Sequence, residues 1–535
     1  MPPPKSEPRD PRTGPSSPGS RGAIAAGSTP TADAGAAVLA AGGNAVDAAV
    51  AACFATAVGE PTLTSLAGGG MMIVRDGATG EVTICDFFSN APLLALADLD
   101  EPDFFPIDLD FGPTTQTFHI GAASAAVPGV IPGLCQALER WGTRSVADVV
   151  APACRMLREG FTLGPYQGFA AKLLEPILTF TESGRRVFHI DGRMMREGDR
   201  FALPQLADTL EALAPDWRGY YDDVLVAAML DQFGPARGGL LTREDFDAYE
   251  VVFREPLEVR YHHSRVLTPP PPAAGGPMIA MMLELLHHRH LAEHEPGGVD
   301  HTRRLACAMA VADESRREGA EALSEPRFSH WHDRFDALLQ AEHLPKARTP
   351  GGPGSTTHIS VIDHTGTSAA VTFSYGEGNA HVIGDTGIVM NNLMGEEDLF
   401  PDGFDAAPRG RRLPTMMSPT LLLDDEGGVT ALGTGGANRI RTAIVQVITR
   451  LHDHGEAPEV AVASPRLHFE AGVLNVETFE HADGGDALTA LGADKLVRFP
   501  DRNMFFGGVH IARRDPDGAL SGGGDPRRGG VLRIV

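Results

Sequence analysis

A pair of threonines, Thr356 and Thr357, stands where a glycine- and proline-rich stretch gives way to alternating β-branched residues. A hydroxyl held in a tight turn before a strand can attack the preceding carbonyl, which moves the peptide bond onto oxygen as an ester that water opens. A cut between Ser355 and Thr356 leaves a chain whose first residue carries both a nucleophilic hydroxyl and a basic α-amine, with a pKa near ~8. The junction is thus a candidate for self-cleavage and an N-terminal threonine nucleophile, but its spacing alone favours the plain start of an edge strand, where β-branched residues pack well.

Histidines are concentrated in another stretch, LLHHRHLAEHE. A spacing of four residues within it is helical and could serve a transition metal, but no third ligand is fixed. We interpret the stretch as a solvated helix face. Triple glycines elsewhere lack the spacing of nucleotide-binding loops, so neither a metal nor any other cofactor is predicted. The histidines concerned are His287, His288, His290 and His294, the last two having the helical spacing.

Strands in hairpins are expected around the threonine pair. The segments TTHISVID and TSAAVTFSY flank a turn at residues 364–366, and PTLLLDD and GGVTALG flank another at residues 424–428. An earlier pair, MMIV and VTIC, surrounds a turn that contains Asp76 and Gly77. Each run has the alternation typical of half-buried strands, with turn-forming residues between its members.

Helices are expected on both sides of these hairpins. The stretch from Thr31 to Val58 predicts two helices separated by glycines, with Asp33 and Asn44 at helix starts. Residues from about 140 to 345 are mostly helical by pattern. Because no βαβ crossover is evident, the sequence favours an α+β fold, an antiparallel sheet layered with helices. Residues 1–22 lack apolar periodicity and are predicted to be a disordered tail.

The composition excludes several classes of partner. The chain has 535 residues, with 45 basic and 70 acidic side chains, a formal charge of −25 and no basic tract. Nucleic acid and anionic membrane surfaces are therefore poor partners. Its longest small-apolar stretch is interrupted by Asn44 and Asp47, so no membrane span is expected. The first residues lack the apolar core of a secretory signal, and five scattered cysteines suit buried free thiols in a reducing compartment, which predicts a cytoplasmic protein.

Further motifs occur in a fixed order over nearly the whole chain. They are AGGNAVDAAVAACFATAVGEP (41–61), GGGMMIV (68–74), AAVPGVIPGL (125–134), GGLLTREDFDAYE (238–250), PPPPAAGGP (269–277), TTHISVID (356–363), TGIVMNNLM (386–394), MSPTLLL (417–423) and GDPR (524–527). From Ala23 to Val535 the chain resembles the gamma-glutamyltranspeptidase family of N-terminal-nucleophile hydrolases. The resemblance implies a four-layer αββα sandwich cut into a large subunit, residues 23–355, and a small subunit, residues 356–535. These subunits would pair with each other as one intertwined domain.

The same resemblance implies roles at the catalytic centre. Thr356 would be the nucleophile, and Ser374 occupies the family's second-threonine position, whose hydroxyl contacts the nucleophile. Gly435 and Gly436 match the glycine pair whose backbone N–H groups form the oxyanion hole. Glycine suits this task because a missing Cβ lets the backbone approach the intermediate.

The substrate pocket departs from the family's pattern. Phe88 stands where the family has an arginine that clamps the glutamyl α-carboxylate, and Leu393 replaces a glutamine. Glu396 keeps an acid at the ammonium-binding position, with a shift to Glu397 as an alternative. The family has two adjacent serines before the M-S-P motif. At these positions Thr415 keeps a hydroxyl and Met416 does not. Each lost polar clamp on a charged substrate costs about 1.5–3 kcal/mol.

One family residue has no clear counterpart. The asparagine after the second threonine falls in SYGEGNAH, where a two-residue deletion leaves Gly376 and Glu377 as candidates. Neither is an amide, so this substrate contact is also expected to be lost.

The sequence thus predicts a self-processing threonine hydrolase or acyltransferase that acts on a small-molecule amide or related acyl bond, with ordinary glutathione a poor substrate. Two other substrates remain open, a glutaryl-type amide and an acyl C–C bond in a specialised-metabolite pathway. The alternative of another class is a non-catalytic scaffold that retains the fold.

Overall fold

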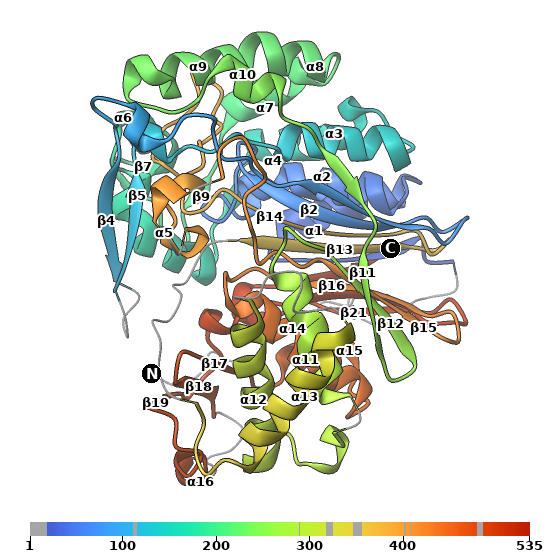
Figure 1. Cartoon of the computed structure of the whole chain (residues 1–535). Helices are drawn as coiled ribbons and strands as arrows, with labels where there is room; N and C mark the ends of the chain where they lie inside the picture. The colour runs from blue at the N-terminus through green and yellow to red at the C-terminus, as the bar shows by residue number, and fades with distance from the viewer. Residues whose placement is uncertain are drawn as a thin grey trace.

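The computed structural model describes residues 19–110, 115–287, 289–316, 325–345, 356–400, 403–406, 408–478 and 485–535. Two antiparallel sheets stacked face to face form the centre of the molecule (Figure 1). The first has the order β10 (Val252–Arg254), β3 (Val82–Phe87), β2 (Gly69–Arg75), β14 (Ser368–Ser374), β13 (Thr357–Asp363), β1 (Gly22–Ala26), β22 (Val531–Ile534). The second has the order β11 (Leu257–Tyr261), β12 (Ser264–Thr268), β15 (Thr420–Asp424), β16 (Val429–Gly433), β20 (His510–Arg514), β21 (Leu520–Gly523).

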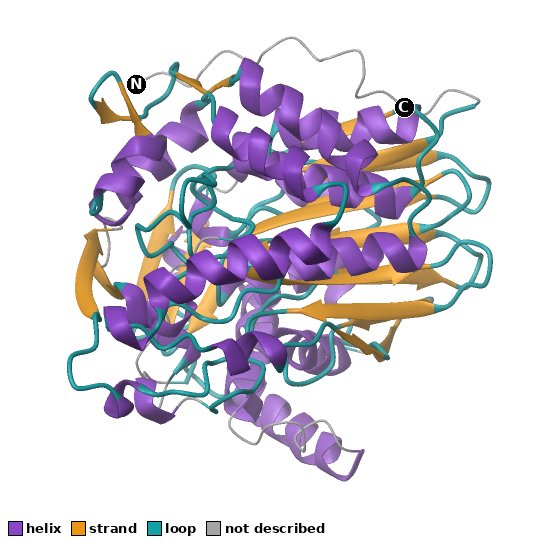
Figure 2. Cartoon of the chain, turned by 90° about the horizontal axis from the view of Figure 1, so that it is seen from above, coloured by secondary structure: helices purple, strands orange, loops and turns teal. Residues whose placement is uncertain are grey.

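Helices cover the outer face of each sheet, as Figures 1 and 2 show from two directions. With the first sheet lie α1 (Thr29–Ala40), α2 (Ala45–Gly59), α3 (Val130–Trp141) and α4 (Val146–Glu159). With the second lie α11 (Gly275–Leu286), α12 (Val299–Ser315), α13 (Glu325–Gln340) and α14 (Arg439–His452). The four-layer αββα sandwich expected from the sequence is confirmed.

Smaller elements surround these layers. The remaining helices are α5 (Pro165–Leu178), α6 (Glu182–Phe188), α7 (Pro204–Leu213), α8 (Trp217–Tyr220), α9 (Ala227–Phe233), α10 (Arg243–Asp247), α15 (Pro458–Ala463) and α16 (Gly485–Thr489). The remaining strands pair as β4 (Phe105–Asp110) with β5 (Thr115–Ile120), β6 (Phe161–Thr162) with β9 (Arg200–Phe201), β7 (His189–Ile190) with β8 (Arg193–Met194), and β17 (Leu467–Glu470) with β18 (Val473–Glu477) and β19 (Lys495–Phe499).

The burial of β13 follows from its place between a helix layer and the second sheet. All seven of its residues are buried. Ile359 and Val361 belong to the core under α1 and α2, whereas Ile362 belongs to the core between the two sheets. Much of that second core is alanine, for example Ala23 and Ala431, which allows the sheets to approach each other closely.

The predicted hairpins are confirmed as β2–β3, β13–β14 and β15–β16. Asn44 caps α2 as expected, because its side chain accepts hydrogen bonds from the N–H groups of Val46 and Asp47 at 3.0 and 2.9 Å. The start predicted at Asp33 is wrong. Ser28 caps α1 instead, and the first turn includes a proline that suits this position.

The segment from 140 to 345 is less helical than its pattern suggests, since strands β6 to β12 lie within it. The histidine stretch is not a helix face either: α11 ends at Leu286, and His290 has a left-handed backbone with φ of 53°. The buried apolar side chains of α11 end there, so packing no longer supports a helix around His294. His288 lies outside the described residues.

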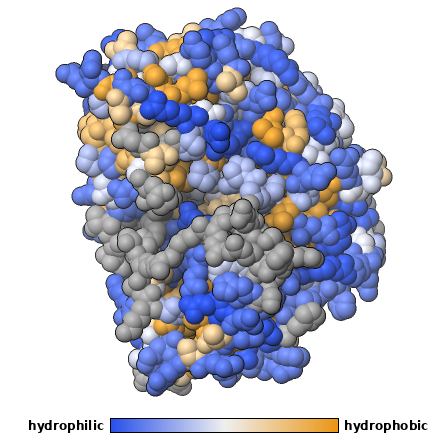
Figure 3. All heavy atoms as spheres, in the orientation of Figure 1, coloured by the Kyte–Doolittle hydropathy of each residue, from blue (hydrophilic) through white to orange (hydrophobic). Residues whose placement is uncertain are grey.

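The end of the predicted tail is structured, because Gly22 is the first residue of β1 and the N–H of Arg21 donates to the carbonyl of Val535. The predicted tail otherwise lies outside the described residues. Hydrophilic residues cover most of the surface in Figure 3, between separate small hydrophobic patches. No helix in the described ranges has both the length and the apolarity needed to cross a membrane.

Candidate active site

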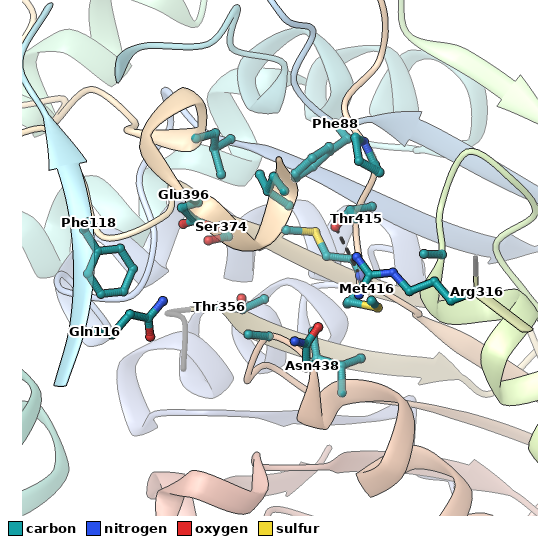
Figure 4. A pocket seen from close by; sticks show the side chains of 17 residues that line it. Phe88, Gln116, Phe118, Arg316, Thr356, Ser374, Glu396, Thr415, Met416 and Asn438 are labelled. Carbon is teal, nitrogen blue, oxygen red and sulfur yellow. Dashed lines mark hydrogen bonds between the residues drawn. The ribbon is translucent and has the colours of Figure 1, made fainter. Parts of the chain in front are cut away.

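Thr356 directly precedes β13 and lies in the wall of a pocket, shown in Figure 4. Its side chain is almost buried, with 6% of the residue exposed. The strand pairing aligns Thr357 with Phe373 of β14, and one further step along both strands sets Thr356 beside Ser374. Ser374 lines the same pocket and accepts a hydrogen bond from the N–H of Gly376 at 3.0 Å. The two hydroxyl residues singled out from the sequence are therefore brought together.

The turn after β16 closes against Thr356. A Cβ at Gly435 would overlap the carbonyl oxygen of Thr356, so this contact requires glycine. Gly436 has φ of 126°, in the region that favours glycine. The turn leads into α14, and Ala437 and Asn438 at the start of that helix line the pocket. The N-terminal end of α14 thus adds the positive end of a helix dipole to this wall.

The histidine that follows the threonine pair faces away from the pocket. The ring of His358 contacts Thr372 Oγ1 at 2.7 Å and Ser360 Oγ at 2.9 Å, between the two sheets. Burial holds the pKa of His358 well below its ordinary value, so the ring is neutral. Among the described residues that line the pocket there is no histidine, lysine or cysteine.

The predicted substrate contacts also meet in this pocket. Its wall includes Phe88, Leu393, Thr415 and Met416, each at most 8% exposed. Thr415 Oγ1 accepts a hydrogen bond from the N–H of Met417 at 3.2 Å, which is the dashed line in Figure 4. This part of the wall is therefore largely apolar, with the Thr415 hydroxyl as its polar group.

A buried ion-pair cluster holds Phe88 in place. The carboxylate of Asp86 contacts Arg254 at 2.9 Å and Arg412 at 3.3 Å and accepts from the Phe88 N–H at 3.1 Å. Tyr249 donates to the Phe88 carbonyl at 3.0 Å. These contacts fix the backbone of Phe88. Its side chain is an apolar ring, where a residue that clamps a carboxylate would have a charged group.

Glu396 is the acid that lines the pocket, and Glu397 is exposed outside it. The carboxylate of Glu396 lies over Gly376, where a Cβ would stand 2.5 Å from its Oε1. Gly376 has a left-handed backbone, with φ of 71°, and Glu377 is buried. Neither of these two candidates is among the residues that line the pocket, so neither replaces the family's asparagine there.

Sequence reasoning missed several lining residues. Gln116 and Phe118 come from β5, where the alternation in TQTFHI could have indicated a strand with one face toward a site. Arg316 follows α12 and reaches the pocket near Thr415 and Met416 (Figure 4). No local pattern marks Arg316, because its place depends on how α12 packs. Ser355, the other side of the predicted cut, lies outside the described residues.

No group of three or more metal-binding side chains occurs in the described ranges. The polar groups that line the pocket include the hydroxyls of Thr356, Ser374 and Thr415, the guanidinium of Arg316 and the carboxylate of Glu396. This set suits nucleophilic attack on an acyl carbon.

Comparisons with known proteins agree with this arrangement. The family model described as Gamma-glutamyltranspeptidase matches residues 31–535. The Acylase ACY 1 proenzyme of Pseudomonas sp. (strain V22) is 32% identical over 94% of this chain and 92% of its own length. The Glutathione hydrolase proenzyme of Escherichia coli (strain K12) is 29% identical over 92% of this chain and 87% of its own.

The solved cephalosporin acylase from Bacillus halodurans superimposes with a TM-score of 0.81 at 25% identity, over 99% of both chains. The relatives are enzymes, so the scaffold alternative is not retained. The chain is an N-terminal-nucleophile hydrolase and belongs to the gamma-glutamyltranspeptidase family.

Proposed function

We propose that this chain is the precursor of an N-terminal-threonine hydrolase or acyltransferase that cuts itself before Thr356 and then cleaves an amide or related acyl bond. The observation that carries the proposal is the Gly435 backbone lying against the carbonyl group of Thr356, in the wall of a pocket shared with Ser374. The names of the two curated relatives, both proenzymes, support self-processing.

Self-cleavage needs only groups at the junction. The Thr356 hydroxyl attacks the carbonyl carbon of Ser355, the C–N bond breaks, and an ester forms at Oγ while the nitrogen becomes an amine. Water then hydrolyses the ester, which releases the Ser355 carboxylate and restores the Thr356 hydroxyl. The products are pieces of 355 and 180 residues.

Turnover would use the same hydroxyl. The α-amine of Thr356 takes the hydroxyl proton as Oγ attacks the acyl carbon, and the N–H groups of Gly435 and Gly436 stabilise the negative charge on the oxygen. The leaving amine then receives the proton, and water or another amine releases the acyl group. Ser374 would orient Oγ during these steps.

The apolar part of the wall argues against ordinary glutathione. Phe88, Leu393 and Met416 stand in place of polar clamps, so a glutamyl group would have fewer polar partners at this buried surface than the family's pattern provides. Arg316 favours a second candidate within the same chemistry, a glutaryl-type acyl donor whose distal carboxylate it would bind. The acylase names of two relatives agree with such a donor. Cleavage of an acyl C–C bond stays a prediction.

Intact mass spectrometry under denaturing conditions tests the first step. We expect a 180-residue fragment that begins at Thr356, and a single uncut chain for Thr356→Ala. Glutaryl-, pentanoyl- and γ-glutamyl-p-nitroanilide then test turnover. A wild-type chain that stays uncut would contradict the proposal. Steady turnover of the γ-glutamyl compound, lost in Thr356→Ala, would instead restore the ordinary family activity.

The donor is tested by Arg316→Met. We expect kcat/KM for the glutaryl compound to fall about 10–100-fold, because a charged hydrogen bond is lost, while the pentanoyl compound is unaffected. Arg514→Met, at the far end of β20, is the matched control and should change neither value. An equal fall for both substrates would show that Arg316 supports the fold rather than the carboxylate.

The cytoplasmic location also stays a prediction. All five cysteines are buried free thiols, which suits a reducing compartment. Cell fractionation would test it, and recovery of the enzyme outside the cytoplasm would contradict it.

A further inference from the structure

Two neighbouring arginines, Arg527 and Arg528, are equally buried at 6% exposure but have very different surroundings. They end the short turn Pro526–Arg528 between β21 and β22. Arg527 forms ion pairs with Glu477 and Asp525. Within the described residues, no carboxylate lies within ion-pair distance of Arg528, and its Nε has no hydrogen-bond partner. A buried cation without a direct counter-charge is costly, so its position calls for a functional reason.

Among the described residues, the guanidinium of Arg528 donates one hydrogen bond, and it goes to the candidate nucleophile. Its Nη1 donates to the carbonyl oxygen of Thr356 at 3.0 Å. A Cβ at Gly435 would lie 2.9 Å from Nη1, and one at Gly436 would lie 3.2 Å from Nη2. The guanidinium therefore sits directly behind both the nucleophile and the proposed oxyanion site.

A carboxylate holds the next residue of the same strand. Thr357 donates its hydroxyl hydrogen bond to Glu60, which also accepts from Thr31 at 2.9 Å. Burial raises the pKa of Glu60, while these hydrogen bonds and the charge of Arg528 oppose the rise. Two successive residues are thus held in place, Thr356 by Arg528 through its carbonyl group and Thr357 by Glu60 through its hydroxyl.

The charge of Arg528 acts on any amine formed at Thr356. A like charge disfavours the protonated form of a nearby amine, and so favours the neutral form that accepts a proton. Carboxylates have the opposite effect, and the structure sets Glu60 behind the strand and Glu396 across the pocket. The other titratable or charged groups near this site are Arg316, Tyr166, Glu377 and the neutral rings of His358 and His510.

We propose that Arg528 is a positioning residue that fixes the backbone of Thr356 and keeps its α-amine in the neutral, proton-accepting form after the cut. This inference rests on the proposed function, because the amine exists only in the processed enzyme. Arg528 touches no pocket surface among the described residues, so it acts through Thr356 rather than on the substrate.

The pH profile of kcat/KM separates this role from a purely structural one, because its acidic limb reports the base of the free enzyme. The substrate is the p-nitroanilide that the wild-type enzyme turns over fastest. We expect Arg528→Lys to keep the limb close to the wild-type midpoint and Arg528→Gln to move it up by about one pH unit. Glu60→Gln, which removes the opposing charge, should move it down.

Arg450→Gln is the control, since Arg450 is a buried arginine paired with Glu456 at 2.7 Å outside this pocket. It should leave the midpoint unchanged. Processed, active Arg528→Gln with an unmoved limb would overturn the proposal. If Arg528→Gln stays uncut, the Glu60→Gln variant provides the test. An acidic limb of its kcat/KM profile that does not move down also overturns the proposal. An uncut wild-type chain would instead contradict the proposed function.

Discussion

Ser374, in the candidate active site, lacks a methyl group that threonine would carry at this position. Its hydroxyl lies beside Thr356 in the strand register and accepts from the N–H of Gly376 at 3.0 Å. Threonine, the family's residue here, has a second substituent on Cβ that restricts rotation about χ1. Serine keeps the chemistry of the hydroxyl but loses that restriction.

We predict that Ser374→Thr keeps or raises kcat, whereas Ser374→Ala lowers kcat about 10–100-fold with little change in KM. The alanine variant loses the hydroxyl that orients Oγ, but it leaves the pocket wall intact. Steady-state kinetics on the preferred p-nitroanilide checks this. A larger fall for Ser374→Thr than for Ser374→Ala would show that the site has no room for the methyl group.

At the scale of elements, the turn between β16 and α14 is the part of the site with the least tolerance. Gly435 has no space for a side chain because the carbonyl of Thr356 fills it. We predict that Gly435→Ala reduces kcat at least about 100-fold or prevents the cut, since the backbone donors and the nucleophile must move apart. Kinetics and intact mass measure the two effects.

Gly427→Ala is the matched control for that substitution. Gly427 lies at the tip of the β15–β16 hairpin with a positive φ of 98°, and open space surrounds it. It should cost about 1 kcal/mol of stability and leave activity unchanged. Equal losses of activity in both variants would mean that contact with Thr356 does not explain the effect.

The central hairpins could be predicted because each combines period-two alternation with turn residues, as in β13–β14. The position of Ser374 beside Thr356 then follows from their register. Gln116 and Arg316 could not be predicted in the same way. The first sits on a small separate hairpin and the second follows a helix, so tertiary packing alone brings them to the pocket. Asp33 failed as a helix start because Ser28 lies one turn earlier.

At the scale of the molecule, each sheet contains strands from both sides of the predicted cut. In the first sheet β1 lies between β13 and β22, and in the second β12 pairs with β15. We predict that the two pieces remain associated after processing and elute together at an unchanged native size. Size-exclusion chromatography followed by denaturing electrophoresis checks this, and separation without denaturant would contradict it.

Buried histidines predict how stability depends on pH. Burial lowers the pKa of His301 to about 3 and those of His452, His468 and His510 to about 4, from an ordinary value of 6.5. As the pH falls from about 6.5 to 4, the unfolded chain binds protons that the folded chain does not, so the free energy of unfolding decreases.

The decrease is at most about 1.4 kcal/mol per pH unit for each histidine. We therefore predict a melting temperature that falls between pH 7 and 4.5, and a smaller fall for His301→Asn. Differential scanning calorimetry measures both. A melting temperature that is flat over this range would show that the rings are protonated in the folded state.

The hydrogen bond from Arg528 to Thr356 joins residues 172 positions apart. A ribosome must therefore add 172 more residues after Thr356 before the guanidinium can reach the junction, and β22 emerges later still. The group that fixes the nucleophile is thus among the last to be synthesised. An unfinished chain lacks this hydrogen bond, so the backbone of Thr356 gains the proposed support from Arg528 only near the end of synthesis.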